Sequence, residues 1–126
     1  MTRIKVYYNQ DNMCTGFTAH GHADNTAVCT AVSVIVINTV NAIQELTDAE
    51  TQVQTDDGLI DFRIISKPTN DTELLIRALW LGLQSIRDEY GAECITLEER
   101  LAPYHTPGAA VSCEPMQELK GGNLHG

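Results

Sequence analysis

The residues best suited to chemistry are a histidine and a cysteine separated by six residues, His22 and Cys29. A cysteine acts as a nucleophile through its thiolate, which forms more readily beside an imidazole and at the start of a helix. His22 ends a strand-like segment and Cys29 opens a helix-like one, so a short connection would bring the two side chains together. The pattern predicts nucleophilic catalysis, with amides of the helix start as candidate oxyanion donors.

Two hydroxyl residues flank Cys29 at helical spacing. Thr26 precedes it by three residues, and a threonine at a helix N-cap accepts a hydrogen bond from the amide three residues on. Ser33 follows Cys29 by four residues and therefore shares its face of the helix. We expect Thr26 to cap this helix. Ser33 either bonds back to its own helix or helps to orient the site.

Other interpretations of this stretch stay open. A lone cysteine in an apolar helix is commonly a packing residue, because cysteine behaves as a small hydrophobe. His20 is a second candidate base on the strand face of His22. A metal site is a further alternative, with His20, His22, Asp24 and Cys29 as its ligands. No ligand spacing supports such a site, so we expect no cofactor.

The remaining candidates carry no partner at informative spacing, and we assign them no role. They include three further cysteines, which form no C-x-x-C pair and signal neither a zinc module nor a disulfide framework. This group consists of Cys14, Cys94, Cys113, His105 and His125.

The elements that position these residues follow from the hydrophobic pattern. Turn chemistry at Gln10-Asp11-Asn12 and Asp56-Asp57-Gly58 predicts two hairpins. Asn70 and Glu73 resemble a capping box at the start of the second helix, and Gly91 is its stop. In chain order we predict strands over 3–8 and 13–21, a helix over 26–46, strands over 51–55 and 59–66, a helix over 70–91 and a strand over 94–98.

Periodicity also predicts which side chains are buried. Alternation places Cys14 on the strand face of His20 and His22, opposite Phe17. The first helix carries an apolar stripe, and the run over 31–37 is so apolar that most of its first half should be buried. That stripe consists of Val28, Val32, Ile35, Val36, Val40, Ile43 and Leu46.

The order ββαββαβ, with hairpins instead of alternating strands and helices, predicts an α+β fold. Two helices should pack on one face of a mostly antiparallel sheet. Residues 1–100 are expected to form one domain. Residues 101–126 contain several prolines and glycines and few large apolar residues, so we expect a loosely structured C-terminal tail.

Charge and hydropathy exclude some function classes. Eight Lys and Arg against seventeen Asp and Glu give a net charge of −9, which disfavours nucleic acid as a direct ligand and favours basic partners. The longest apolar run, over 28–37, is too short to span a bilayer and has no signal-peptide pattern. We therefore expect a soluble, cytoplasmic protein that does not bind membranes.

Two motifs, Gly21-His22-Ala23 and Val28-Cys29-x-Ala31-Val32-Ser33, make the chain resemble the bacterial ribosomal-processing cysteine protease family over about residues 1–100. The resemblance implies a homodimeric endopeptidase that removes the N-terminal extension of a large-subunit ribosomal protein, the twenty-seventh. It also implies that His22 is the general base, Cys29 the nucleophile and Ser33 a supporting residue. An acidic protease acting on a basic terminus is electrostatically sensible.

The chain departs from the family pattern in two ways. Its connection between His22 and Cys29 is shorter than the family's flexible loop, which shapes the substrate site. Thr26 also stands where the family tends to place aspartate; both are good N-caps, but the negative charge is lost. A rival interpretation is therefore a catalytically weakened relative that binds a ribosomal-protein terminus, or another basic partner, without cutting it.

Overall fold

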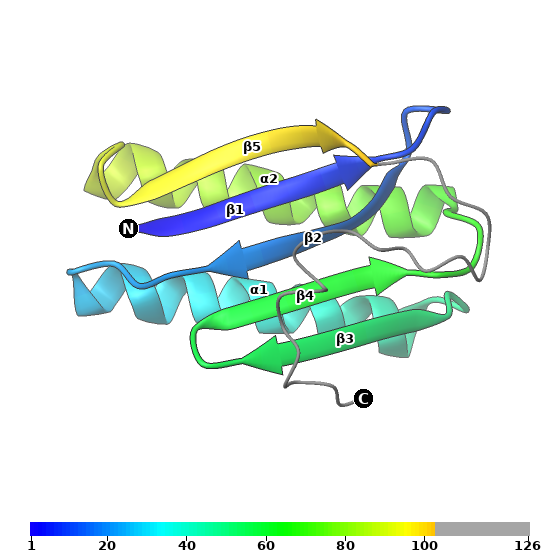
Figure 1. The fold of residues 1–126 in the computed structure, drawn as a ribbon, viewed down its shortest axis with the longest axis horizontal. Helices are drawn as coiled ribbons and strands as arrows, with labels where there is room; N and C mark the ends of the chain where they lie inside the picture. The colour runs from blue at the N-terminus through cyan, green and yellow to red at the C-terminus, as the bar shows by residue number, and fades with distance from the viewer. Residues whose placement is uncertain (103–126) are drawn as a thin grey trace.

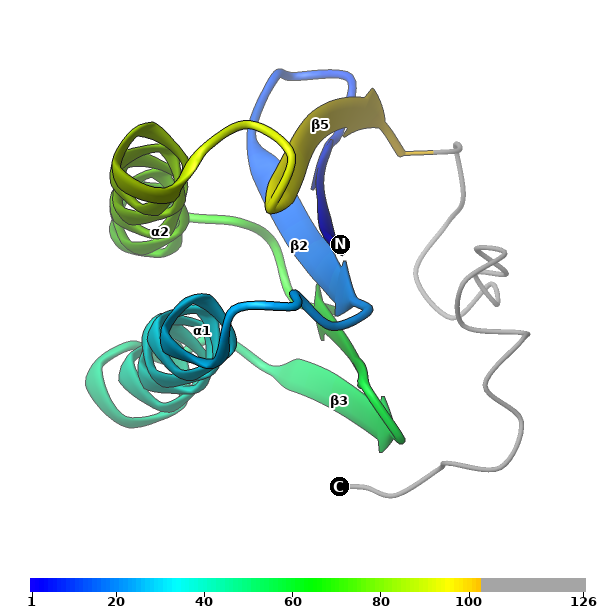
Figure 2. The same cartoon turned by 90° about the vertical axis from the view of Figure 1, so that its left-hand side faces the viewer.

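The chain folds into two layers, with two helices side by side on one face of a five-stranded sheet (Figures 1 and 2). The computed structural model describes residues 1–102. The α+β class and the order ββαββαβ are confirmed, while most of the predicted tail lies outside the described residues. The elements are β1 (Thr2–Tyr8), β2 (Cys14–His20), α1 (Thr26–Leu46), β3 (Thr51–Asp56), β4 (Leu59–Ile64), α2 (Asn70–Tyr90) and β5 (Ile95–Leu101).

The strand order brings distant parts of the chain together. The sheet runs β3-β4-β2-β1-β5, antiparallel except for the parallel pair β1 and β5. β4 pairs directly with β2, and the last residue of β2, His20, lies opposite Leu59 at the start of β4. The turn between β3 and β4 therefore lies beside the segment that leaves β2 toward α1.

The core lies between the sheet and the helices. Phe17 of β2 and Phe62 of β4 are both fully buried, with ring centroids 5.2 Å apart. α1 buries Val28, Val32, Val36, Thr39, Val40 and Ile43, and α2 buries Thr72, Ile76, Leu79 and Leu83. Burial of these apolar faces is the main force that holds the helices on the sheet.

A bulge in the first hairpin reverses the predicted orientation of Cys14. Tyr7 pairs with Gly16 while Tyr8 pairs with Cys14, so Thr15 is the extra residue. One extra residue moves all side chains beyond it to the opposite face. Cys14 is consequently fully buried in the core, and its predicted place on the face of His20 was wrong.

Both predicted N-caps were wrong by one residue. Asn25, not Thr26, caps α1: its side chain accepts a hydrogen bond from the Ala27 amide at 2.8 Å, and Thr26 is the first residue of the helix. Asparagine ranks at least as high as threonine at this position, which explains the outcome. Thr69 caps α2, in a capping box with Thr72.

The apolar stripe of α1 was only partly right. Leu46 is 74% exposed, and so are Val34 (63%) and Ile37 (50%) in the half of the helix that was expected to be buried. By length and composition alone, α1 is also long and apolar enough to cross a membrane. This was not predicted from the sequence, because the longest apolar run, over 28–37, is shorter than the helix. The buried residues of α1 pack in the core described above, and its exposed residues mix apolar side chains such as Val34 and Ile37 with polar ones such as Asn38 and Asn41.

Replacing Phe17 by alanine should destabilise the fold. Both the Phe17–Phe62 contact and the buried ring volume would be lost, which typically costs about 3–5 kcal/mol. Urea unfolding of Phe17→Ala should show this loss of unfolding free energy. The exposed Leu46→Ala is the control and should change it by about 0.5 kcal/mol or less; equal effects of the two variants would contradict the assigned core.

Candidate active site

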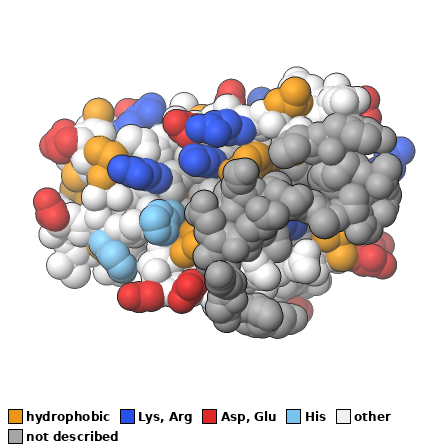
Figure 3. Space-filling view, in the orientation of Figure 1, with side chains coloured by type: hydrophobic (Ala, Val, Ile, Leu, Met, Phe, Trp, Pro, Cys, Tyr) orange, Lys and Arg blue, Asp and Glu red, His pale blue; other side chains and the backbone are white. Residues whose placement is uncertain are grey.

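A cavity of about 380 Å³ lies where β2 ends and α1 begins. Both candidate histidines, His20 and His22, and the candidate cysteine Cys29 line it. Figure 3 shows the histidine side chains of the described chain gathered on one part of this face. The residues that line the cavity are Thr2, Ala19, His20, Gly21, His22, Cys29, Val32, Ser33, Val36, Thr55, Asp56, Gly58, Leu59 and Ile60.

Cys29 lies in the first turn of α1, and its sulfur lies within hydrogen-bonding distance of the Ala23 backbone. The Ala23 amide lies 3.2 Å from Cys29 Sγ as a donor, and the Ala23 carbonyl oxygen lies 3.2 Å away as an acceptor. A thiol can donate to that carbonyl, whereas a thiolate can accept from that amide. A hydrogen bond to an ionised acceptor is stronger than a neutral one, so the Ala23 amide can stabilise the thiolate.

Three amides at the start of α1, those of Ala27, Val28 and Cys29, already donate hydrogen bonds. Ala27 donates to the Asn25 side chain, and Val28 and Cys29 both donate to the Asn25 carbonyl at 3.1 Å. These groups therefore do not point freely toward the cavity as the oxyanion donors that the sequence suggested. The Ala23 amide is the backbone donor that lies against the sulfur.

His22 is exposed and lies against the turn between β3 and β4. A Cβ built on Gly58 would come 2.8 Å from His22 Nε2, so the imidazole contacts the bare backbone there. The His22 carbonyl accepts a hydrogen bond from the Met1 nitrogen at 2.6 Å. Within residues 1–102 no hydrogen bond joins the His22 ring to Cys29, whose sulfur bonds only to Ala23.

Of the two hydroxyl candidates, Ser33 lines the cavity and Thr26 does not. Ser33 lines the cavity one turn after Cys29, as the spacing predicted. Thr26 is exposed and is not among the lining residues. Its cap role passes to Asn25, so Thr26 has no direct part in the cavity.

Sequence analysis missed the contribution of the second hairpin to the cavity. Five residues around the turn, from Thr55 to Ile60, line it. The motif Asp56-Asp57-Gly58 predicted the turn but not its location, because that depends on the pairing of β4 with β2. The backbone hydrogen bond from the Gly21 amide to the Gly58 carbonyl, at 3.0 Å, fixes this contact.

The metal alternative has no geometric support in the described part of the chain. No group of three or more His, Cys, Asp or Glu residues among residues 1–102 is arranged to hold a metal ion. His20 and His22 line the cavity together with Cys29, but Asp24 is not among the lining residues.

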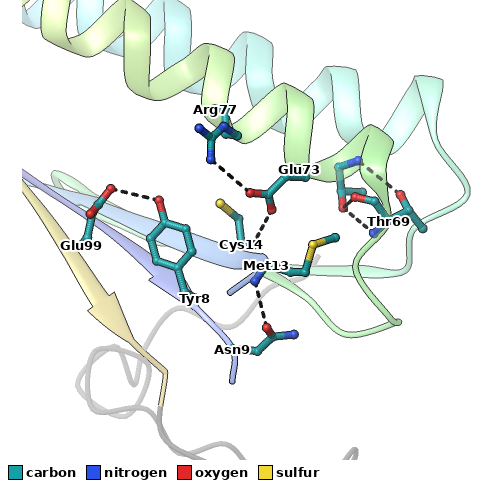
Figure 4. A network of polar contacts seen from close by, with 9 residues as sticks. Tyr8, Asn9, Met13, Cys14, Thr69, Glu73, Arg77 and Glu99 are labelled. Carbon is teal, nitrogen blue, oxygen red and sulfur yellow. Dashed lines mark hydrogen bonds and ion pairs between the residues drawn. The ribbon is translucent and has the colours of Figure 1, made fainter. Parts of the chain in front are cut away.

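A second cysteine lies in a separate polar network at the other end of β2 (Figure 4). The Cys14 amide donates to Glu73 Oε1 at 2.6 Å, and Glu73 pairs with Arg77 at 3.6 Å. Glu73 thus binds a strand amide and is not the capping-box residue that the sequence suggested. Burial, reinforced by the Glu73 charge, raises the pKa of the Cys14 thiol to about 12. Burial and the nearby Cys14 also raise the pKa of Tyr8, which donates to Glu99 at 3.1 Å.

Comparison with known proteins gives a consistent family. The model of the family described as cysteine protease Prp matches residues 1–95. Two curated relatives from strains of Staphylococcus aureus, each called ribosomal processing cysteine protease Prp, are 31% identical over 97 residues. The match covers 71% of this chain and 92% of each relative.

Solved structures are similar over the same region. A crystal structure of the essential ribosomal processing protease Prp from S. aureus with a covalently linked product peptide has a TM-score of 0.73 and 27% identity, covering 79% of this chain and 99% of that one. The S. aureus protease with a substrate peptide has a TM-score of 0.71, 26% identity and the same coverage. A protein from Streptococcus mutans has a TM-score of 0.67 and 26% identity, covering 80% and 98%.

Alkylation of the native protein should distinguish Cys14 from Cys29. At pH 8 a thiol with a pKa of about 12 is ionised in only about one molecule in ten thousand, and Cys14 is fully buried. Iodoacetamide labelling followed by peptide mass spectrometry should find Cys14 at least about a thousandfold slower in native than in urea-unfolded protein. Native labelling of Cys14 at the rate of Cys29 would contradict its assigned environment.

Proposed function

The chain belongs to the cysteine protease Prp family, and we propose that it cleaves a ribosomal protein with Cys29 as nucleophile and His22 as general base. One observation carries this assignment of residues. Cys29, held by the start of α1, and His22, which follows β2, line the same cavity. Both lie within the residues that match the family model.

The reaction proceeds as acyl transfer in two steps. Cys29 Sγ forms a bond to the carbonyl carbon of the scissile peptide as the thiol proton passes to His22. His22 then protonates the leaving amine as the C–N bond breaks, which leaves a thioester on Cys29. Water, deprotonated by His22, attacks this thioester and releases the carboxylic acid and the free thiol. The chemistry requires no cofactor.

Two features of the cavity support the first step. The Ala23 amide lies 3.2 Å from Cys29 Sγ, within hydrogen-bonding distance of the sulfur that attacks the substrate. His22 is exposed and lines the same cavity, so a small adjustment of its ring breaks no packing in the core. Catalytic hydrogen bonds are often formed only when substrate binds. Ser33, which also lines the cavity, is a supporting residue of this site.

The proposed substrate is the N-terminal segment of a large-subunit ribosomal protein, the twenty-seventh, whose extension is removed during ribosome maturation. The S. aureus relatives are ribosomal processing proteases, and one binds a substrate peptide in its crystal structure. A net charge of −9 favours association with a basic ribosomal-protein terminus. We place the protein in the cytoplasm, where this substrate is assembled into ribosomes, and infer no direct contact with membranes.

A second candidate function is a binding protein that holds such a terminus without cutting it. The observation that favours it is the absence, within residues 1–102, of a hydrogen bond from His22 to Cys29. A short connection between the two residues could hold them apart. Alkylation of Cys29 against pH separates the functions, because a reactive thiol is modified well below the ordinary thiol pKa of about 8.5. Reaction only at alkaline pH, unchanged in His22→Ala, would favour the binding protein.

Replacing the nucleophile should abolish cleavage. Cys29→Ala removes the sulfur that forms the acyl-enzyme, so we expect at least about a thousandfold loss of kcat on a peptide with the extended ribosomal-protein terminus, followed by mass spectrometry. Cys94→Ala is the matched control, since Cys94 is also a partly buried free thiol but does not line the cavity. Undiminished cleavage by Cys29→Ala would rule out the proposed nucleophile.

We also propose that the protein acts as a homodimer through the outer face of α1. Val34 and Ile37 are exposed there, and Leu81 of the neighbouring helix α2 is 64% exposed. No charged residue occurs in α1 before Glu45, and depletion of charge is typical of the centre of an interface. A membrane surface fits less well, because helices that lie on membranes carry basic residues around the apolar face.

A charge in this face should produce monomers. In a two-fold interface each substitution occurs twice and places like charges close together, so Val34→Glu should weaken dimerisation by about a hundredfold or more. Sedimentation should show two 13.8 kDa chains for the parent and one for the variant. Gln52→Glu, on an exposed position of β3, is the control and should remain dimeric. A monomeric parent at micromolar concentration would refute the proposal.

A further inference from the structure

The turn between β3 and β4 contributes a glycine that directly faces the proposed general base. Gly58 has a φ of +71°, a conformation that L side chains rarely adopt. An added Cβ there would lie 2.8 Å from His22 Nε2, 3.4 Å from Cε1 and 3.5 Å from Cδ2. The imidazole thus meets the turn by its Nε2 edge, and no side chain fits between the two.

We infer that Gly58 is a positioning residue for His22, whose imidazole lies against the bare backbone of this turn. The inference rests on the proposed function, because it assumes that His22 is the general base. An exposed histidine otherwise samples several rotamers, and holding a catalytic group near its productive geometry lowers the entropic cost of reaction. Because the ring contacts the turn through its Nε2 edge, the other ring nitrogen, Nδ1, lies away from the turn.

The backbone before His22 is fixed on two sides, so the ring cannot escape a larger side chain at position 58 by a shift of the chain. The Gly21 amide donates to the Gly58 carbonyl at 3.0 Å. On the other side, a Cβ on Gly21 would come 2.5 Å from the Met1 carbonyl oxygen. A substitution at position 58 must therefore be accommodated by rotation of the His22 side chain or by opening of the turn.

The alternative is that Gly58 serves only the turn, where its positive φ is required. Two variants and a control separate the roles. Gly58→Asn keeps a residue that tolerates positive φ but adds a Cβ toward His22, and Gly58→Ala adds the smallest side chain. Gly91→Ala is the matched control, since Gly91 also has a positive φ, of +110°, but does not line the cavity.

The experiment measures peptide cleavage, thermal unfolding and Cys29 alkylation against pH for these variants, alone and combined with His22→Ala. We expect Gly58→Ala and Gly58→Asn to lower kcat by about tenfold or more with KM nearly unchanged, and to shift the pH profile of alkylation. In the His22→Ala background neither should change the alkylation rate further. Gly91→Ala should retain the kcat of the parent.

The possible outcomes separate the inference from the proposed function. Full activity of both Gly58 variants, or an alkylation defect that persists in His22→Ala, would overturn the positioning role. The positioning role would also be overturned if, in both variants, the loss of activity were fully explained by a loss of folded protein. If His22→Ala itself cleaves as fast as the parent, the proposed function fails instead, and the inference fails with it.

Discussion

The structure depends above all on the burial of the inner face of α1 against the sheet. Val28 is fully buried and immediately precedes Cys29, so the packing that holds the helix also fixes where the thiol lies. α1 follows β2 after a connection of only five residues, 21–25. The short connection and the buried helix together place the end of the strand, and hence His22, beside the first turn of the helix. The cavity is a consequence of this packing and not of any separate binding domain.

Bare backbone at two glycines determines how closely the surrounding elements approach the histidine. Gly21 lies against the Met1 carbonyl, and Gly58 lies against the His22 ring. Both contacts are closer than any Cβ would allow, and both join segments far apart in sequence. The start of β1 and the second hairpin are therefore parts of the site, although neither supplies a residue with obvious chemistry.

The sequence predicted what is local and missed what is long-range. Every element, the fold class and the placement of Cys29 with Ser33 on one helix face followed from periodicity and turn residues. The orientation of Cys14 did not, because the single bulged residue Thr15, opposite the step from Tyr7 to Tyr8, has no signature in the alternation. The caps differed because Asn25 and Thr69 compete with equally suitable neighbours. The β3–β4 turn lines the cavity because of the strand order, and the exposure of Val34 depends on what the outer face of α1 contacts. Neither property is encoded in a local sequence pattern.

Cys14 and Cys29 show how the same side chain can lie in opposite environments. Cys14 is enclosed by the core and lies near the Glu73 carboxylate, and both raise the pKa of its thiol. Cys29 is partly exposed, has no carboxylate among its hydrogen-bond partners and lies against a backbone amide. A negative charge on sulfur is therefore strongly disfavoured at Cys14, at one end of β2, whereas Cys29, beyond the other end, has a backbone N–H beside its sulfur. Since nucleophilic chemistry requires the thiolate, this difference in environment, rather than residue type, is why we propose Cys29 and not Cys14 as the nucleophile.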